Sequence, residues 1–153
     1  MFSIITPDEK TWLNKFHFSS KVRVRFSETD AFGHVNNVSY FIYFEQVRVD
    51  YLRELAIDSV LKGDDKNFIV TADLYCQYLG ETHFGDELTV MARTAKLGNS
   101  SVDLEYAILN EKGQLVAVGR GALVFMDRTT KRSTPIPNEI RQKIVGYEGL
   151  VLA

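Results

Sequence analysis

The sequence predicts an α+β domain in which a five-stranded antiparallel sheet accompanies one long helix. An uninterrupted run without Gly or Pro after Asn37 indicates a helix that ends near Leu55. Four segments with strand patterns follow it and are joined by short turns, and short turns force neighbouring strands to run antiparallel. With 153 residues, no internal repeat and no low-complexity tract, the chain is expected to form one domain over residues 1–153.

The N-terminal residues predict a short helix followed by the first strand. Residues 6–9 have the composition of a helix start with Thr6 as the cap, and the helix is expected to extend to Lys15. We expect this helix to pack Trp12 on the body of the domain. Residues 22–26 alternate apolar and basic side chains, which is the period-two pattern of a strand.

The second half of the chain predicts four more strands. They are expected over residues 70–78, 88–97, 102–109 and 115–126, with a loop over 58–67 before them and a closing helix over 135–144 after them. Gly98 and Asn99 indicate a tight hairpin. The segment 115–126 is apolar on both faces, so we expect it inside the sheet, where Gly119 and Gly121 leave room for a close neighbour.

The long helix carries apolar side chains around more than half of its circumference at about 100° per residue. We therefore expect a curved sheet to wrap it. Its polar side chains gather on one side and comprise Ser39, Gln46, Asp50, Arg53 and Glu54. Glu45 and Arg48 fall inside the apolar arc and are three positions apart, so we expect them to pair with each other.

Composition and charge argue against several classes of protein. The net charge is −2 with both signs interleaved, which leaves no footprint for nucleic acid and no basic amphipathic stretch for a membrane surface. No apolar run approaches the length of a membrane span, and residues 1–10 lack the features of a signal peptide. A single cysteine, Cys76, cannot form an internal disulfide, so we expect a cytoplasmic setting and a packing role for it.

The turn between the first strand and the long helix holds the candidate chemistry. Asp30 supplies a carboxylate, Gly33 permits unusual backbone angles, and Asn36 and Asn37 precede the helix. A helix N-terminus presents unpaired N–H groups that stabilise negative charge. A carboxylate beside such donors forms a plausible catalytic pair.

The turn and the long helix carry a set of residues that is typical of a known family. These residues are Asp30, Gly33, His34, Val35, Asn36, Asn37, Tyr40, Phe44, Glu45 and Arg48. The set resembles the 4-hydroxybenzoyl-CoA thioesterase-like branch of the hot-dog superfamily. The His34–Asn37 run is also similar to plant-type acyl-carrier-protein thioesterases of the same superfamily. The resemblance implies a sheet wrapped around one helix, and hydrolysis of an acyl-CoA or acyl-carrier-protein thioester without a metal or organic cofactor.

The resemblance also implies roles for individual residues. Asp30 would be the general base or the nucleophile, and the N–H of Asn37 or a neighbour would polarise the thioester carbonyl. The acyl-carrier-protein enzymes carry an Asn two residues after the Asp, where this chain has Phe32, and that difference favours CoA. The residues expected at the site are Asp30, His34 and Asn37 for catalysis, and Gly33, Asn36, Tyr40, Glu45, Arg128, Lys131 and Arg132 for substrate binding.

Each of these residues also has a purely structural reading. In that reading, Asp30 is simply a turn or cap residue, and Asn36 simply caps the helix. His34 either orients Asp30 or the substrate, or is an ordinary partly buried histidine. Glu45 is either half of a structural pair or a second active-site carboxylate. The basic cluster at 128–132 is either a solvated loop or a group of cations that binds phosphate.

Three further expectations concern function and assembly. A non-catalytic acyl-CoA-binding module is the rival to an enzyme, whereas a dehydratase would need a His-centred motif placed elsewhere. The three histidines, His17, His34 and His83, are too scattered in the sequence to indicate a metal site. A sheet closing around one helix leaves an exposed edge strand, so we expect a homodimer or a homotetramer.

Overall fold

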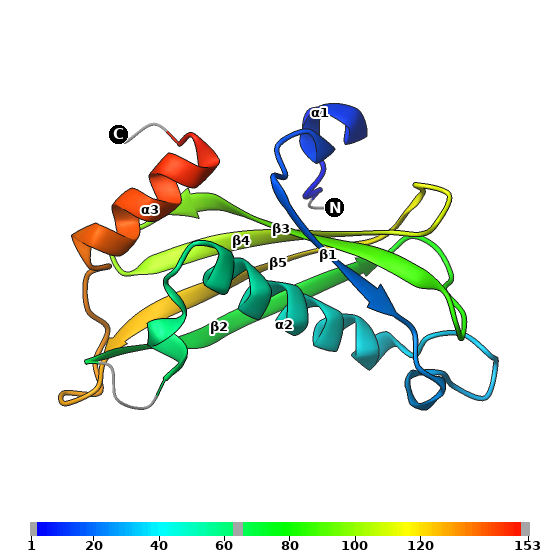
Figure 1. Cartoon of the computed structure of the whole chain (residues 1–153), viewed down its shortest axis with the longest axis horizontal. Helices are drawn as coiled ribbons and strands as arrows, with labels where there is room; N and C mark the ends of the chain where they lie inside the picture. Colours follow the sequence, from blue (N-terminus) through cyan, green and yellow to red (C-terminus); the bar gives the residue numbers. More distant parts are fainter. Residues whose placement is uncertain (1–2, 63–65, 151–153) are drawn as a thin grey trace.

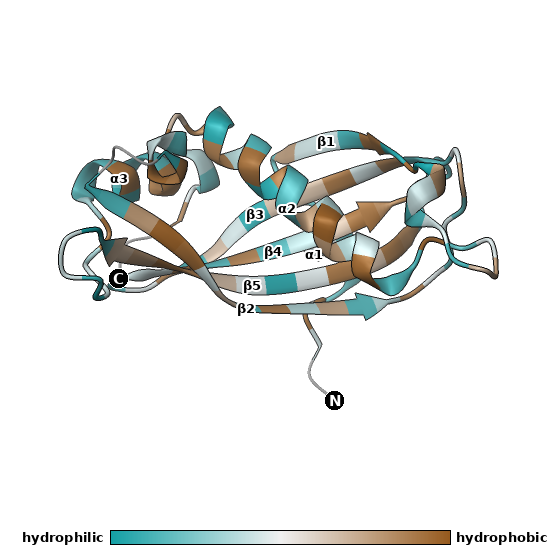
Figure 2. Cartoon of the chain, turned by 90° about the horizontal axis from the view of Figure 1, so that it is seen from below, coloured by the Kyte–Doolittle hydropathy of each residue, from teal (hydrophilic) through white to brown (hydrophobic). Residues whose placement is uncertain are grey.

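The computed structural model of the protein describes residues 3–62 and 66–150. Five strands form one antiparallel sheet in the order β1-β3-β4-β5-β2 (Figure 2). The strands are β1 (Phe18–Arg23), β2 (Asn67–Tyr78), β3 (Glu87–Leu97), β4 (Ser101–Leu109) and β5 (Leu115–Asp127), and the α-helices are α1 (Glu9–Leu13), α2 (Asn37–Glu54) and α3 (Asn138–Glu148). The α+β class and the five-stranded sheet are confirmed, and β5 lies inside the sheet as expected.

The long helix α2 lies along one face of the sheet, and together they form the hot-dog arrangement that the resemblance implies (Figure 1). Phe44, on the buried side of α2, is fully buried and stacks on Tyr106 of β4 with ring centroids 4.7 Å apart. The helix comes this close because Gly119 of β5 has no side chain, since a Cβ there would lie 2.5 Å from the Phe44 ring. The close neighbour predicted beside Gly119 is therefore α2 itself, whereas Gly121 approaches the backbone of Asp73 in β2.

The opposite face of the sheet is covered by the N-terminal segment. Successive side chains of a strand point to opposite faces, so Tyr106 faces α2 while Ala107 faces away from it. Ala107 packs there against Trp12 of α1, which is 1% exposed, as the sequence predicts. The cap of α1 differs from the prediction. Asp8, not Thr6, caps the helix, because the Asp8 carboxylate accepts the N–H of Thr11 at 2.9 Å.

The first strand and the closing helix are displaced from their predicted positions. β1 ends at Arg23 because Val24, although buried, bonds through its backbone to Asp86 and Gly85 rather than to a strand. Phe26 begins a 3₁₀ turn over residues 26–28 and is 76% exposed, which the alternating pattern did not predict. α3 begins at Asn138 because prolines precede it. The predicted loop 58–67 contains a 3₁₀ turn over Asp58–Leu61, and its residues 63–65 lie outside the described chain.

The sheet covers only one side of α2, which corrects the predicted helix faces. Ser39 was expected on the solvent side but is 3% exposed, and its hydroxyl lies 3.4 Å from the carbonyl of Glu28. Val38 and Ile42 were expected to be buried but are 61% and 46% exposed. The apolar arc of α2 is therefore wider than the surface that this sheet covers.

The two edges of the sheet are β1 and β2. β2 has 12 residues, and its middle residues from Val70 to Asp73 are exposed. Among the helices of the described segments, none is long and apolar enough to cross a membrane.

Candidate active site

Asp30 anchors the turn between β1 and α2 with one of its two carboxylate oxygens. Oδ1 accepts the backbone N–H of Phe32 at 2.9 Å and that of His34 at 3.4 Å. The Asp30 N–H in turn donates to the carbonyl of His34 at 2.8 Å, and Gly33 has a φ of +81° inside the turn. Oδ2 has no hydrogen-bond partner among the described residues, and the side chain is exposed. Asp30 thus has both its predicted structural role and a free oxygen.

The N-terminus of α2 presents donors near this turn. Asn36 caps the helix, since its Oδ1 accepts the N–H of Ser39 at 3.0 Å while its Nδ2 donates to the carbonyl of Glu28 at 3.1 Å. Within the part of the chain that the structure describes, the N–H groups of Asn37 and Val38 have no acceptor. These two amides are available to a ligand oxygen.

A buried carboxylate that the sequence reasoning missed supports the turn from inside. Glu28 is 5% exposed and accepts hydrogen bonds from the Arg25 N–H at 2.8 Å and from the Tyr43 hydroxyl at 3.0 Å. Its carboxylate also lies 3.0 Å from the Arg25 guanidinium. Burial alone would raise the pKa of Glu28, but these bonds outweigh it, so the pKa is lowered and the group is ionised at neutral pH. The i,i+3 spacing from Arg25 was visible in the sequence, whereas the burial was not.

Aromatic side chains from α2 and β2 fill the space under the helix N-terminus. The Tyr78 hydroxyl donates to the carbonyl of Asn37 at 2.7 Å and fastens the end of β2 to the start of α2. Tyr40 is 3% exposed, and its hydroxyl is 2.8 Å from that of Thr82. Burial raises the pKa of Tyr78 to about 12 and that of the Cys76 thiol to about 11. Both groups are therefore protonated at neutral pH, and Cys76 is not a thiolate nucleophile.

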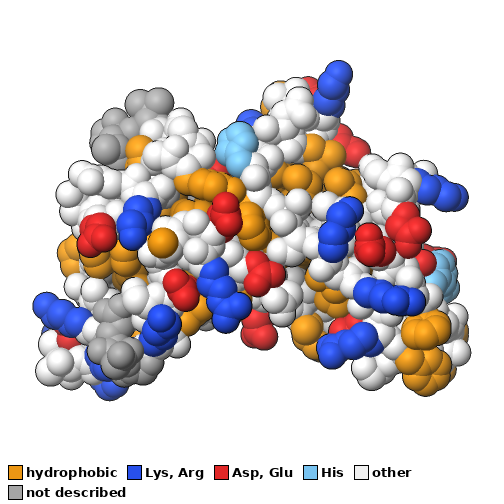
Figure 3. Space-filling model, viewed as in Figure 1, with side chains coloured by type: hydrophobic (Ala, Val, Ile, Leu, Met, Phe, Trp, Pro, Cys, Tyr) orange, Lys and Arg blue, Asp and Glu red, His pale blue; other side chains and the backbone are white. Residues whose placement is uncertain are grey.

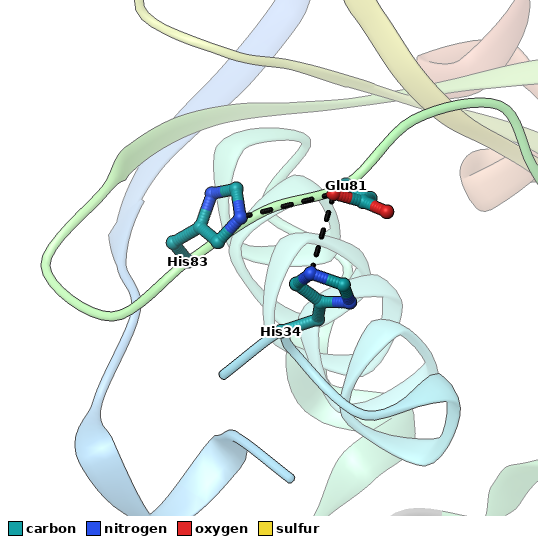
Figure 4. Close-up of side chains that lie close together, drawn as sticks. All are labelled: His34, Glu81 and His83. Carbon is teal, nitrogen blue, oxygen red and sulfur yellow. Dashed lines mark ion pairs between the residues drawn. The ribbon is translucent and has the colours of Figure 1, made fainter. Parts of the chain in front are cut away.

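His34 lies next to His83, so the expectation of scattered histidines holds for His17 only. The two imidazole rings are 5.2 Å apart, and both face the carboxylate of Glu81 (Figure 4). The His34 ring is directed toward Glu81, and the hydrogen bonds between His34 and Asp30 involve the His34 backbone, whose N–H donates and whose carbonyl accepts.

The predicted pair between Glu45 and Arg48 is wrong. The Arg48 guanidinium instead donates to the hydroxyl of Tyr106 at 3.2 Å, because β4 places that hydroxyl against the helix. Glu45 is exposed and has no ion-pair partner among the described residues. Replacing Glu45 therefore does not strand a buried cation, contrary to the sequence-based interpretation.

The segment after β5 holds the basic cluster of Arg128, Lys131 and Arg132, and it lies at the other end of the sheet from the segment between β1 and α2, which holds Asp30 (Figure 1). The pairing of β2 with β5 places Asp127 opposite Asn67, whereas Tyr78 at the other end of β2 contacts the start of α2. β2 has 12 residues with a rise of about 3.3 Å each, so its two ends, and with them the cluster and the α2 N-terminus, are roughly 35 Å apart within one chain.

Charge is mixed over the molecular face that carries α2. Figure 3 shows acidic and basic side chains interspersed on it, without a large area of one sign. The face has the charge pattern expected from the sequence, which does not suit a nucleic-acid backbone.

The fold and this site define a class of protein. The profile of the thioesterase-like superfamily matches residues 24–144, which include the whole site described above, and the chain belongs to that superfamily. Relatives and structural neighbours in this superfamily are thioesterases, and this chain is a thioester hydrolase.

Three similar proteins illustrate the range of relatives. YsmA of Bacillus subtilis (strain 168) is 34% identical over 88% of this chain and 89% of its own length. The long-chain acyl-CoA thioesterase FadM of Escherichia coli (strain K12) is 25% identical over 82% of this chain and 95% of its own. A thioesterase from Thermus thermophilus, solved with coenzyme A and zinc, is 34% identical with a TM-score of 0.79, and the match covers 90% of this chain and 98% of that one.

Proposed function

We propose that the chain is an acyl-CoA thioesterase in which Asp30 acts as general base or nucleophile. Two observations at the N-terminus of α2 support this proposal together. The Oδ2 of Asp30 has no hydrogen-bond partner among the described residues, and the amides of Asn37 and Val38 lack acceptors there. The names of FadM and of the coenzyme A complex from Thermus thermophilus support CoA as the carrier. We also propose a cytoplasmic location, because the single cysteine forms no internal disulfide.

The chemistry follows from these groups. The N–H groups of Asn37 and Val38 would bind the thioester carbonyl oxygen and stabilise the negative charge that develops on it. As a base, Asp30 would take a proton from water while the water oxygen bonds to the carbonyl carbon. The carbon–sulfur bond then breaks, and the CoA thiolate leaves and takes up a proton. As a nucleophile, Asp30 would form a mixed anhydride that water hydrolyses to the same products.

The other predicted residues would position the substrate. Gly33 and Asn36 shape the turn and the helix start, and we propose that His34 and Tyr40 border the reacting group. Val38, Ile42 and Glu45 share one exposed side of α2, because they are separated by four and three positions. We propose that the acyl chain follows this side from the amides toward Glu45.

A second copy of the chain would bring the basic cluster to the site. If β2 pairs antiparallel with its symmetry mate about the exposed middle of the strand, the Asn67 end of one β2 meets the Tyr78 end of the other. Arg128 of the partner subunit would then lie near the α2 N-terminus, although the two are far apart within one chain. This arrangement explains how one CoA could contact both Asp30 and the cluster.

We therefore predict that the protein is a homodimer or a homotetramer. Light scattering coupled to size exclusion at micromolar concentration should give at least twice the mass of 17.4 kDa. Val70, an exposed residue of the β2 edge, provides a variant, because Val70→Lys would place charges in the proposed pairing and shift the protein toward the monomer. A monomeric wild-type protein would contradict the prediction.

Replacing the basic cluster should weaken substrate binding and spare turnover. We expect Lys131→Ala with Arg132→Ala to raise the KM for acyl-CoA about tenfold with kcat nearly unchanged, because these exposed cations would contact phosphate in the ground and transition states alike. Arg128→Ala is a separate variant, because Arg128 also donates to the carbonyl of Lys62.

Lys15→Ala, on the face of the sheet covered by α1, is the control and should leave KM unchanged. If the cluster variants also leave KM unchanged, the phosphate contacts lie elsewhere. The open surface hollow of about 560 Å³ that Lys21 and Arg23 line is the next place to test.

Release of free thiol from a panel of acyl-CoAs tests the proposed function directly. Acyl groups of different length and ring content, each also offered on acyl carrier protein, should show turnover of at least one CoA ester. Turnover of carrier-protein esters alone would show that the substrate is an acyl carrier protein ester and not an acyl-CoA. Tight binding of acyl-CoA without turnover would instead favour the non-catalytic binding module.

A further inference from the structure

Two segments that are far apart in the sequence bring three potential metal ligands together. His34 follows the Asp30 turn, and His83 lies between β2 and β3. An isolated antiparallel bridge pairs these two residues, and the Val35 N–H donates to the carbonyl of Thr82 at 2.8 Å. The backbone therefore holds the two imidazoles side by side, and Glu81 lies beside them (Figure 4).

The distances among the three side chains suit one small cation. The Glu81 Oε2 lies 3.3 Å from the His34 Nε2 and 3.9 Å from the His83 Nε2, and one ligand atom from each residue lies within 4.8 Å of the others. In a tetrahedral zinc site with bonds of about 2.0–2.1 Å, neighbouring ligand atoms are about 3.4 Å apart. Small rotations of exposed side chains would close the remaining difference.

A second carboxylate is placed to orient one of the ligands. The Asp86 Oδ2 accepts the backbone N–H of His83 at 2.9 Å and lies 3.8 Å from the Nδ1 of the same residue. Metal-binding histidines commonly direct their second ring nitrogen toward a carboxylate, which fixes the tautomer and the ring orientation. A hydrogen bond from Nδ1 to Asp86 in the metal-bound form would leave the Nε2 lone pair to face Glu81 and His34.

We propose that His34, Glu81 and His83 bind a divalent transition metal, with Zn²⁺ as the preferred ion. Two imidazoles and one carboxylate are ligands that suit zinc, whereas Ca²⁺ and Mg²⁺ prefer sites made of oxygen alone. Three protein ligands leave a fourth position open to water or another small ligand. A bound ion would cross-link the Asp30 turn to the segment before β3, because His34 belongs to that turn through its backbone hydrogen bonds to Asp30.

Zinc titration of the full-length protein after chelator treatment tests the site. The wild type should bind one Zn²⁺ per chain by calorimetry, and Zn²⁺ should raise its melting temperature. Co²⁺ should give the visible absorption of a tetrahedral centre. Glu81→Gln and His83→Ala should weaken binding at least 100-fold, and Asp86→Asn should weaken it roughly tenfold. All three side chains are at least partly exposed, so these variants should fold.

His17→Ala is the matched control, because it removes an exposed imidazole that faces the Tyr147 ring instead. It should bind Zn²⁺ as the wild type does. Equal affinity in the wild type and His83→Ala, or no binding at micromolar Zn²⁺, would overturn the proposal. Neither result depends on thioesterase activity, so this site and the proposed function can fail separately.

Discussion

Asp30→Asn is expected to lower kcat by about 10²-fold or more while the protein remains folded. The asparagine keeps a side-chain oxygen that can accept the N–H groups of Phe32 and His34, so the turn should survive. It removes the carboxylate that would take a proton from water or attack the thioester. Steady-state kinetics with an active acyl-CoA, together with a melting curve, measure the two effects separately.

Asp8→Asn is the matched control, because Asp8 also accepts a backbone N–H through its carboxylate but lies at the cap of α1. Its kcat should match that of the wild type. If Asp30→Asn remains fully active, the role of Asp30 is confined to the turn. A folded Glu45→Gln variant without turnover would then move the chemistry to the helix carboxylate.

Glu28→Ala is expected to lower the free energy of unfolding by about 2–3 kcal/mol, a large effect for one side chain. The substitution leaves the buried Tyr43 hydroxyl without its acceptor and removes the carboxylate that holds the Arg25 N–H. Chemical denaturation at pH 7 measures the loss. Arg25→Ala is the comparison, and it should cost less than Glu28→Ala, because the Arg25 side chain is 72% exposed.

The contribution of Glu28 should also depend on pH in a defined direction. Its pKa in the folded protein is lowered from the ordinary value of 4.5, so the ionised form stabilises the fold above that value. The stability difference between the wild type and Glu28→Gln should be full at pH 7 and should shrink as the pH falls below about 4.5. A difference that stays constant down to pH 3 would show that the charge of Glu28 does not stabilise the fold.

Local patterns in the sequence predicted most of the fold because the determinants of these elements are local. The Gly98–Asn99 hairpin and the apolar character of β5 depend on residues close together in the chain. The end of β1 was misplaced because Val24 keeps the alternation while its backbone pairs with Asp86, 62 positions later. A period-two pattern shows which side chains are buried but not where the strand pairing stops.

The candidate site was predicted in part, and its gaps have a common cause. Asp30 and the α2 N-terminus follow each other in the sequence, so their proximity could be inferred. The contact of His34 with His83 spans 49 residues and depends on how two loops meet. The i,i+3 rule suggested that Arg48 pairs with Glu45, but the fold offers it the Tyr106 hydroxyl of a facing strand.

The main chain fixes much of the geometry at the start of α2, and this has a consequence for divergence among related sequences. Backbone hydrogen bonds join Asp30 to His34, Glu28 to Asn36 and Val35 to Thr82. The exposed side of α2 beyond this point is formed by side chains such as Val38 and Ile42, which no such bonds constrain. Substitutions there can alter the surface offered to a ligand without moving the turn. The architecture thus allows mutations on the exposed side of α2 to change ligand preference, while the backbone of the Asp30 turn and the start of α2 keeps its geometry.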